Sequence, residues 1–169
     1  MTLKEFNSLE REAAKSELLK CCGSQTWASL MIDNFPFASD EELHNKAATL
    51  WYEECKEEDW LEAFQHHPKI GDVKSLHEKF SSTKQWAGAE QGNVERANTE
   101  IIQELSSGNK EYEDKFGFIF IVSATGKSAE EMLAILKDRL INDYDEEIQL
   151  AMQEQNKITQ LRLKKLIHD

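Results

Sequence analysis

Residues 39–51 read Ser39-Asp40-Glu41-Glu42-Leu43-His44-Asn45-Lys46-Ala47-Ala48-Thr49-Leu50-Trp51, and this stretch decides the fold class. Its first four residues have the pattern of a capping box, in which a serine hydroxyl and a glutamate carboxylate satisfy backbone N–H groups at the start of a helix. Leu43, Ala47, Leu50 and Trp51 then recur at the spacing of one helical face. The stretch therefore predicts an amphipathic helix that buries its apolar side.

The same kind of pattern recurs along the chain. Ser128-Ala129-Glu130-Glu131 forms a second capping box before an apolar stripe. With two prolines and seven glycines, the chain has few helix breakers. We therefore expect an all-α, single-domain bundle of roughly eight helices covering residues 1–169. Further helices are expected over residues 27–35, 60–67, 83–105, 128–140 and 145–167.

Three local expectations are more specific. Gly108-Asn109 is expected to stop the helix over residues 83–105. In the last helix, the expected core residues are Ile148, Met152, Ile158, Leu161 and Leu166. The segment Phe118–Val122 is apolar and β-branched, so its pattern fits either a buried strand or a buried extended segment. Because no partner strand is evident, we favour a buried connector or helix end.

Composition narrows the classes of function. The chain has 20 basic and 32 acidic residues, a formal charge of −12, which disfavours nucleic acid and anionic membranes as partners. Cys21, Cys22 and Cys55 lack the spacing of a structural zinc site and are expected to be free thiols. The start of the chain lacks an apolar signal stretch and its end is not a peroxisomal signal, so we expect a soluble cytoplasmic protein.

The run His66-His67-Pro68-Lys69-Ile70-Gly71-Asp72 is the first candidate for chemistry. A residue before proline is pushed toward extended geometry, so His67 should stand at the end of a helix. Histidine is the side chain that ordinarily titrates near neutral pH. Taken alone, the run is better explained as a helix terminus, with histidine near the negative end of the helix dipole.

Two more groups could join it. Glu90-Gln91 shares a helical face with Ala87 and Val94, so the polar pair stands among small and apolar neighbours. This pair is either part of a pocket or a solvated site at a helix contact. Arg162 flanks the apolar stripe of the last helix and could clamp an anion or simply extend into solvent. Arg139 is a weaker candidate of the same kind. No motif for a metal, a phosphate loop or a nucleophilic serine or cysteine was found.

The ordered set of motifs resembles a known family. It consists of His67-Pro68-x-Ile70-Gly71, Glu90-Gln91, Phe116-Gly117-Phe118-x-Phe120, Gly126-Lys127-Ser128, Arg139-Leu140 and Lys157-Ile158-x-x-Leu161-Arg162-Leu163. This order resembles the 2-oxo-4-hydroxy-4-carboxy-5-ureidoimidazoline (OHCU) decarboxylases, which form (S)-allantoin in urate degradation. The resemblance covers essentially the whole chain. It departs at Ala87, where the family usually has serine.

The resemblance implies an all-α homodimer that needs no cofactor and no metal. It implies that His67, Glu90 and Arg162 are catalytic, with His67 as the proton donor. It also implies that the substrate, an anionic ureidoimidazoline, is bound partly through backbone groups. The implied substrate-binding residues are Pro68, Ala87, Gln91, Phe120, Ile121, Val122, Ser123 and Ala124.

Two alternatives remain at this point. The chain could be a non-catalytic helical interaction module, in which His67, Glu90 and Arg162 would be scattered toward solvent. It could also be a decarboxylase or tautomerase that acts on a related ureido or imidazolone acid. The enzyme hypotheses require these residues, which are distant in sequence, to converge on one pocket.

Overall fold

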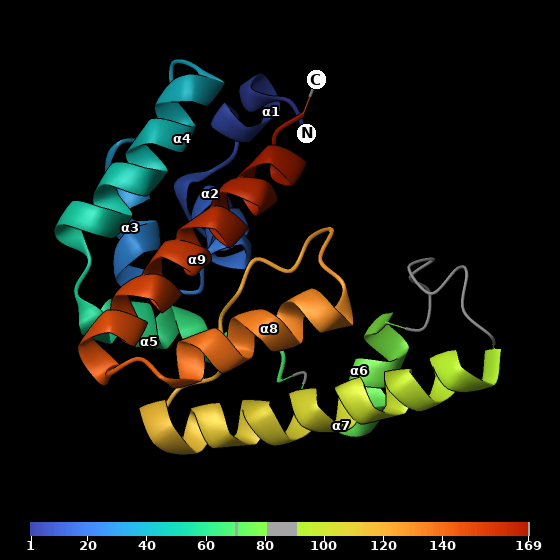
Figure 1. The fold of residues 1–169 in the computed structure, drawn as a ribbon. Helices are drawn as coiled ribbons and strands as arrows, with labels where there is room; N and C mark the ends of the chain where they lie inside the picture. The colour runs from blue at the N-terminus through green and yellow to red at the C-terminus, as the bar shows by residue number, and fades with distance from the viewer. Residues whose placement is uncertain (70, 81–90, 169) are drawn as a thin grey trace. The chain divides into compact units, whose positions relative to one another are not determined.

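The computed structural model describes the backbone of residues 1–69, 71–80 and 91–168, with their side chains except those of residues 91–97. Over these residues the chain is helical and contains no strand (Figure 1), which confirms the all-α prediction. The helices are α1 (Leu3–Asn7), α2 (Arg11–Cys21), α3 (Gln25–Asp33), α4 (Asp40–Thr49), the π-helical η1 (Leu50–Glu54), α5 (Glu57–Gln65), α6 (Val73–Phe80), α7 (Gln91–Phe116), α8 (Ala129–Leu140) and α9 (Tyr144–Leu166).

The chain forms two compact units that are not successive in sequence. Unit 1 contains Met1–His67, Ile121–Ser123 and Ile148–Asp169. Unit 2 contains Pro68–Phe120 and Ala124–Glu147. Each unit is therefore assembled from segments that lie far apart in the chain. The expectation of one domain over residues 1–169 stays a prediction.

Unit 1 has a core of buried tryptophans whose ring N–H groups are satisfied by backbone carbonyls. The indole of Trp27 donates to the carbonyl of Ala47 at 3.0 Å, and that of Trp51 donates to the carbonyl of Met152 at 2.9 Å. These bonds remove the cost of burying a polar indole nitrogen. The two ends of the chain meet in this unit, since the Met1 ammonium donates to the Leu166 carbonyl at 3.0 Å (Figure 1).

The predicted start of α4 is confirmed, with one change in its cap. The Ser39 hydroxyl accepts a hydrogen bond from the Glu42 amide at 3.1 Å. The Glu42 carboxylate, however, accepts from the Ala38 amide at 2.6 Å and does not close the box onto Ser39. The second predicted capping box, between Ser128 and Glu131 at the start of α8, is complete.

The buried face of α9 differs from the predicted one. Ile148 and Met152 are buried as expected, but Leu161 is 38% exposed. The buried stripe instead continues through two polar residues, Gln155 and Thr159. It then ends on Leu163 and Ile167. The sequence pattern failed here because an apolar stripe was assumed, whereas the core of unit 1 accepts polar side chains that are hydrogen-bonded to one another.

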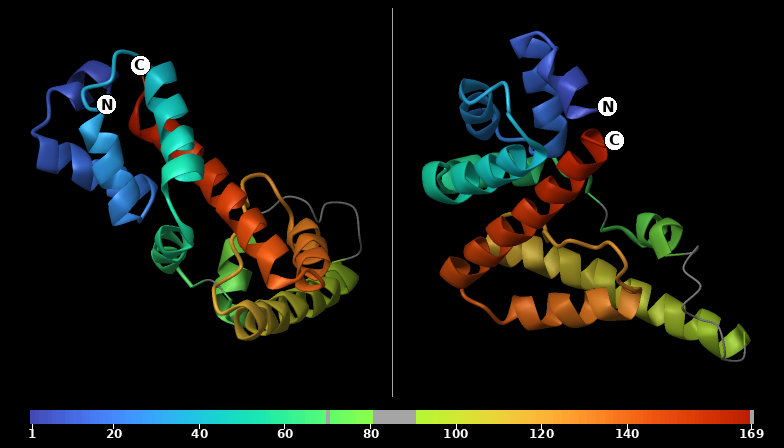
Figure 2. Two further views of the ribbon diagram at one scale, coloured as in Figure 1. Left: turned by 90° about the vertical axis from the view of Figure 1, so that its left-hand side faces the viewer. Right: turned by 90° about the horizontal axis from the view of Figure 1, so that it is seen from above.

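Unit 2 is built on α7 packed along α8 (Figure 2). The prediction that Gly108-Asn109 would stop α7 is wrong, because the helix continues to Phe116. Gly108 has a packing role: a Cβ atom placed there would lie 2.7 Å from Cδ2 of the buried Leu136. The glycine thus permits the close approach of α7 and α8, and it does not break the helix.

The segment after α7 is an extended connector, as favoured from the sequence. Residues 119–124 have no regular secondary structure, and Gly117 turns the chain with a φ of 79°. Phe118 and Ile121 are buried. A short apolar run therefore serves as a connector whose side chains contribute to both cores.

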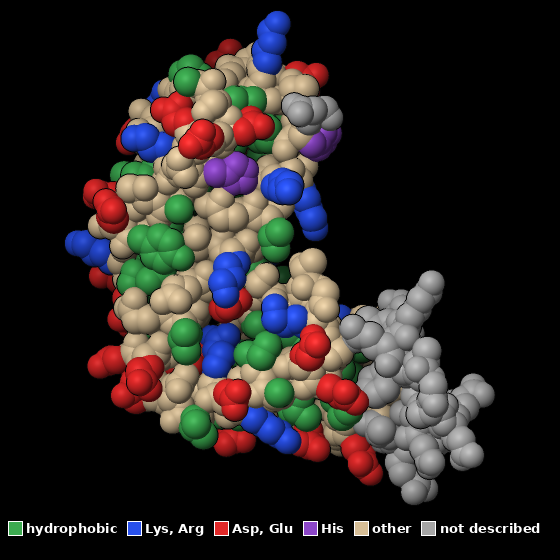
Figure 3. All heavy atoms as spheres, turned by 45° about the horizontal axis from the view of Figure 1, so that its top comes forward, with side chains coloured by type: hydrophobic (Ala, Val, Ile, Leu, Met, Phe, Trp, Pro, Cys, Tyr) green, Lys and Arg blue, Asp and Glu red, His purple; other side chains and the backbone are tan. Residues whose placement is uncertain are grey.

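The described surface carries many charged side chains of both signs. Acidic and basic side chains are interspersed over the described part of the face shown in Figure 3. Among the described residues, no helix is both long enough and apolar enough to cross a membrane.

Candidate active site

His67 lies just beyond the end of α5, where the sequence placed it. His66 is the C-cap residue of this helix, and the His67 amide donates to the Phe64 carbonyl at 3.2 Å. The loop after α2 closes over this end, since a Cβ on Gly23 would lie 2.5 Å from the side chain of His66. His66 is exposed and His67 is half-buried. The helix end therefore separates two adjacent histidines, and only His67 turns into the protein.

The imidazole of His67 contacts a residue that the sequence analysis missed. Its Nε2 lies 2.5 Å from Oε1 of Gln155 on α9. Gln155 is fully buried. Its Nε2 bonds to the Thr159 hydroxyl at 3.2 Å, and that hydroxyl donates to the Gln155 carbonyl at 3.0 Å. His67 is thus attached to a buried polar network.

Arg162 lies in the same unit and acts on the same histidine. Its side chain is half-buried, and Nη1 donates to the backbone carbonyl of Cys21 at 3.3 Å. Burial lowers the pKa of His67 below its ordinary value of 6.5, the Gln155 hydrogen bond raises it, and the charges of Arg162 and His66 lower it further. The net result is an imidazole held in its neutral form, with a guanidinium nearby.

The connector predicted to line a pocket is divided between the two units. Ile121, Val122 and Ser123 belong to unit 1, together with His67 and Arg162. Pro68, Phe120 and Ala124 belong to unit 2.

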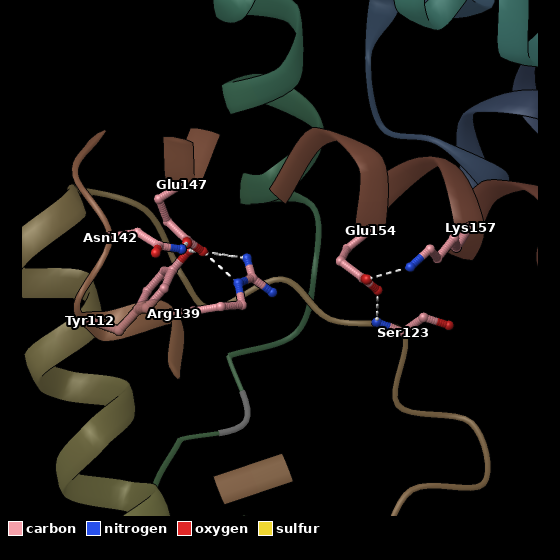
Figure 4. Close-up of polar contacts among 7 residues, drawn as sticks. All are labelled: Tyr112, Ser123, Arg139, Asn142, Glu147, Glu154 and Lys157. Carbon is pink, nitrogen blue, oxygen red and sulfur yellow. Dashed lines mark hydrogen bonds and ion pairs between the residues drawn. The ribbon is translucent and has the colours of Figure 1, made fainter. Parts of the chain in front are cut away.

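One backbone group of this connector is already engaged. The Ser123 amide donates to Oε2 of Glu154 at 2.8 Å, and Oε1 of Glu154 accepts from Lys157 at 2.6 Å (Figure 4). Glu154 therefore fixes the connector against α9, and in this arrangement the Ser123 amide bonds to a protein carboxylate.

Arg139 is a structural residue and not an anion clamp. Its side chain is buried and its guanidinium lies 2.5 Å from Glu147, which is fully buried. The Tyr112 hydroxyl donates to the same carboxylate, and Asn142 adds a bond of 3.0 Å (Figure 4). The guanidinium also lies 4.8 Å from the centre of the Phe120 ring. Because its charge is neutralised inside unit 2, the sequence-based suggestion of an anion site here is wrong.

Three predicted site residues, Ala87, Glu90 and Gln91, have no described side chain. Ala87 and Glu90 lie outside the described residues, and Gln91 is the first residue of α7 with no description of its side chain. Among the described residues, no cluster of histidine, cysteine or carboxylate groups could hold a metal ion.

Gln155 and Thr159 carried a signal that could have been found in the sequence. They precede Arg162 by seven and three positions, so they lie on its side of the helix. The two residues are four positions apart, and they lie on the stripe that joins Met152 to Leu163. A search for polar residues at core positions of the arginine-bearing helix would have identified them.

Fold and site together define an all-helical protein in which an imidazole bonded to a buried polar network and a guanidinium whose charge acts on it lie in one unit, although they are distant in sequence. The chain belongs to the OHCU decarboxylase family, because the model of that family matches residues 7–164.

Individual relatives agree with this membership. The uric acid degradation bifunctional protein TTL of Arabidopsis thaliana is 36% identical over 94% of this chain and 48% of its own length. The 2-oxo-4-hydroxy-4-carboxy-5-ureidoimidazoline decarboxylase of Halalkalicoccus jeotgali is 26% identical over 98% of this chain and 92% of its own. The chain thus spans about half of the Arabidopsis protein, and it spans 33% of a bifunctional relative from Bacillus subtilis.

Solved structures have the same fold. A crystal structure of an OHCU decarboxylase in the presence of (S)-allantoin is 35% identical, with a TM-score of 0.72 over 95% of this chain and 100% of that one. A crystal structure of an (S)-allantoin synthase is 19% identical, with a TM-score of 0.66, and supports the fold alone.

Proposed function

We propose that this chain decarboxylates OHCU to (S)-allantoin and CO₂ in urate degradation, without a cofactor. The observation that carries the proposal is the convergence of His67 and Arg162 in unit 1, where the charge of Arg162 acts on the imidazole. Family membership supports the substrate, since relatives are named for uric acid degradation and for this decarboxylation.

The chemistry suits these groups. When CO₂ leaves, the electron pair of the broken bond can be delocalised into the conjugated ring of the substrate, so the protein must orient the bond, stabilise the charge and protonate one face. We assign protonation to His67, which as a neutral imidazole first takes up a proton from water and then delivers it to the carbon that has lost CO₂. General acid–base catalysis of this kind is worth about 10²–10⁴ in rate.

Substrate binding is assigned to several residues. Arg162 is the anion-binding residue, because its planar fork matches a carboxylate. Glu90 and Gln91 are assigned to the ureido or hydroxyl side, with Pro68, Ala87 and the connector Phe120–Ala124 around the ring. With Ala87 in place of the usual serine, this site binds without a hydroxyl contact there. A homodimeric, cytoplasmic enzyme is part of the proposal.

The interaction-module hypothesis is less well supported. A surface module leaves His67 and Arg162 free in solvent, whereas both are half-buried and attached to other groups of unit 1. The alternative that fits the same geometry is an enzyme that acts on a related ureido acid.

The test generates the unstable substrate in place. Urate is treated with urate oxidase and hydroxyisourate hydrolase, and the decay of the product is followed by circular dichroism with and without this protein. We expect faster decay and an excess of (S)-allantoin. A decay rate and an enantiomer ratio that the protein leaves unchanged would reject the proposal.

A further inference from the structure

We propose that Gln155 is a positioning residue that keeps the hydrogen of the His67 imidazole on Nε2 and leaves Nδ1 as the nitrogen that exchanges a proton with the substrate. This inference rests on the catalytic role proposed for His67. It goes further by naming the nitrogen that reacts and the residue that selects it.

The argument begins with the single hydrogen of the Thr159 hydroxyl. This hydroxyl donates to the backbone carbonyl of Gln155, one helical turn earlier, at 3.0 Å. Such back-bonding is a common use of a threonine inside a helix. Having given its hydrogen to that carbonyl, Thr159 must act as the acceptor in its 3.2 Å contact with the side chain of Gln155. The NH₂ group of the Gln155 amide therefore faces Thr159.

The orientation of this amide determines the tautomer of the histidine. With its NH₂ group toward Thr159, Gln155 presents Oε1 to His67, 2.5 Å from Nε2. A carbonyl oxygen can only accept, so Nε2 must carry the hydrogen. A neutral imidazole has one such hydrogen, and Nδ1 is left with a lone pair. Among the described residues, Nδ1 has no hydrogen-bond partner.

Burial makes the arrangement selective. Gln155 is fully buried and Thr159 is 3% exposed, so water does not replace a lost bond. If the amide turned over, its NH₂ group would face Nε2 and its oxygen would face a hydroxyl that has no hydrogen left to give. In the orientation present in the structure, the Gln155 amide and the Thr159 hydroxyl both have suitable partners.

Burial keeps His67 in the neutral form to which this argument applies. The Gln155 hydrogen bond raises the pKa of the imidazole, whereas the charges of Arg162 on α9 and His66 at the end of α5 add to the lowering by burial. Near neutral pH the ring is therefore a neutral species for which the choice between two tautomers matters.

The test is the nitrogen spectrum of the histidine side chains in ¹⁵N-labelled protein above pH 7. The chain has 5 histidines, and the His67→Gln variant identifies the His67 signals by their loss. We expect wild-type His67 to show a protonated Nε2 and an unprotonated Nδ1. Gln155→Leu and Thr159→Val should both move these signals toward a mixture of tautomers. Thr159→Ser, which keeps the hydroxyl, should retain the wild-type pattern.

Kinetics provide the second measurement. Because Gln155→Leu leaves both tautomers populated, kcat should fall by a few fold, in proportion to the lost fraction of the active tautomer, with KM little changed. A wild-type spectrum with Nδ1 protonated, a Gln155→Leu spectrum like wild type, or a Gln155→Leu variant with wild-type kcat would overturn the inference. If wild type itself had no decarboxylase activity, the proposed function would fail, while the spectrum would still decide the tautomer.

Discussion

Oε1 of Gln155 lies 2.5 Å from Nε2 of His67, although 88 residues separate them in the sequence. This contact joins the end of α5 to the buried stripe of α9, and it explains why the histidine is fixed. Arg162 flanks the same stripe, so a single helix carries both the group that orients the imidazole and the charge that acts on it.

The pH dependence of the site follows from the lowered pKa of His67. Burial, Arg162 and His66 lower this pKa, so the midpoint of the imidazole titration lies below its ordinary value of 6.5. Because we propose the neutral ring as the active form, kcat/KM should decline as the pH falls, with a midpoint below pH 6.5. A profile that rises as the pH falls through 6.5 would indicate the opposite protonation state.

The two neighbours of His67 should shift its titration in opposite directions. Arg162→Met removes a positive charge and should raise the pKa of His67, whereas Gln155→Leu removes a bond that raises it and should lower it further. Nuclear magnetic resonance titration of the labelled ring measures both. Shifts of the same sign in the two variants would contradict these assignments.

The buried ion pair of unit 2 should matter for stability. Arg139→Met leaves the fully buried Glu147 without its charge partner, which typically costs about 3–5 kcal/mol in the free energy of unfolding. Replacing both residues by apolar ones should recover much of that loss. The free energy of unfolding of wild type, Arg139→Met and the double variant is measured by urea denaturation.

An exposed ion pair serves as the matched control for this experiment. Lys110 and Asp114 form another short ion pair, at 2.7 Å, but their side chains are 79% and 66% exposed. Lys110→Met should therefore change stability very little, because an exposed pair is screened by water and salt. Equal effects of Lys110→Met and Arg139→Met would disprove the structural role given to Arg139.

Gly108 should be sensitive to the addition of one methyl group. A Cβ atom there would lie 2.7 Å from the buried Leu136, and overpacking of this kind costs about 1–3 kcal/mol. The better helix propensity of alanine returns about 1 kcal/mol of this loss. We expect Gly108→Ala to destabilise unit 2, as measured by thermal unfolding. Gly71→Ala, where the new atom would lie 3.4 Å from Asn109, should be close to neutral, and equal effects would refute the packing argument.

The cysteines should be unreactive in the folded protein. Burial raises the pKa of Cys21 to about 11 and those of Cys22 and Cys55 to about 12, so few thiolates form at pH 8. Alkylation by iodoacetamide should be slow in native protein and fast in urea. Rapid native labelling of any of the three would contradict their burial.

Local sequence signals predicted the elements whose causes are local. The caps at Ser39 and Ser128 set the starts of α4 and α8, and Pro68 follows the end of α5. The connector around Phe118–Val122 was also predicted, because a short apolar run without a partner strand cannot form a sheet and is best buried as a connector.

Features that depend on tertiary contacts could not be predicted in this way. The local sequence predicts a helix stop at Gly108, because the contact of this residue with Leu136 on another helix leaves no mark on the local pattern. Gln155 and Thr159 do not stand out in the sequence, because buried polar residues are recognised only when their partners are known. The role of Arg139 depends in the same way on Glu147, which neutralises its charge.

The central claim, that His67 catalyses decarboxylation of OHCU, is tested most directly by circular dichroism of freshly generated substrate with wild type and His67→Gln at equal concentration. The variant should retain the thermal unfolding of wild type to within a few degrees. We predict that wild type accelerates decay to (S)-allantoin and that His67→Gln loses about 10²–10⁴ of this acceleration. A folded His67→Gln protein with wild-type turnover and a single allantoin enantiomer would contradict the account.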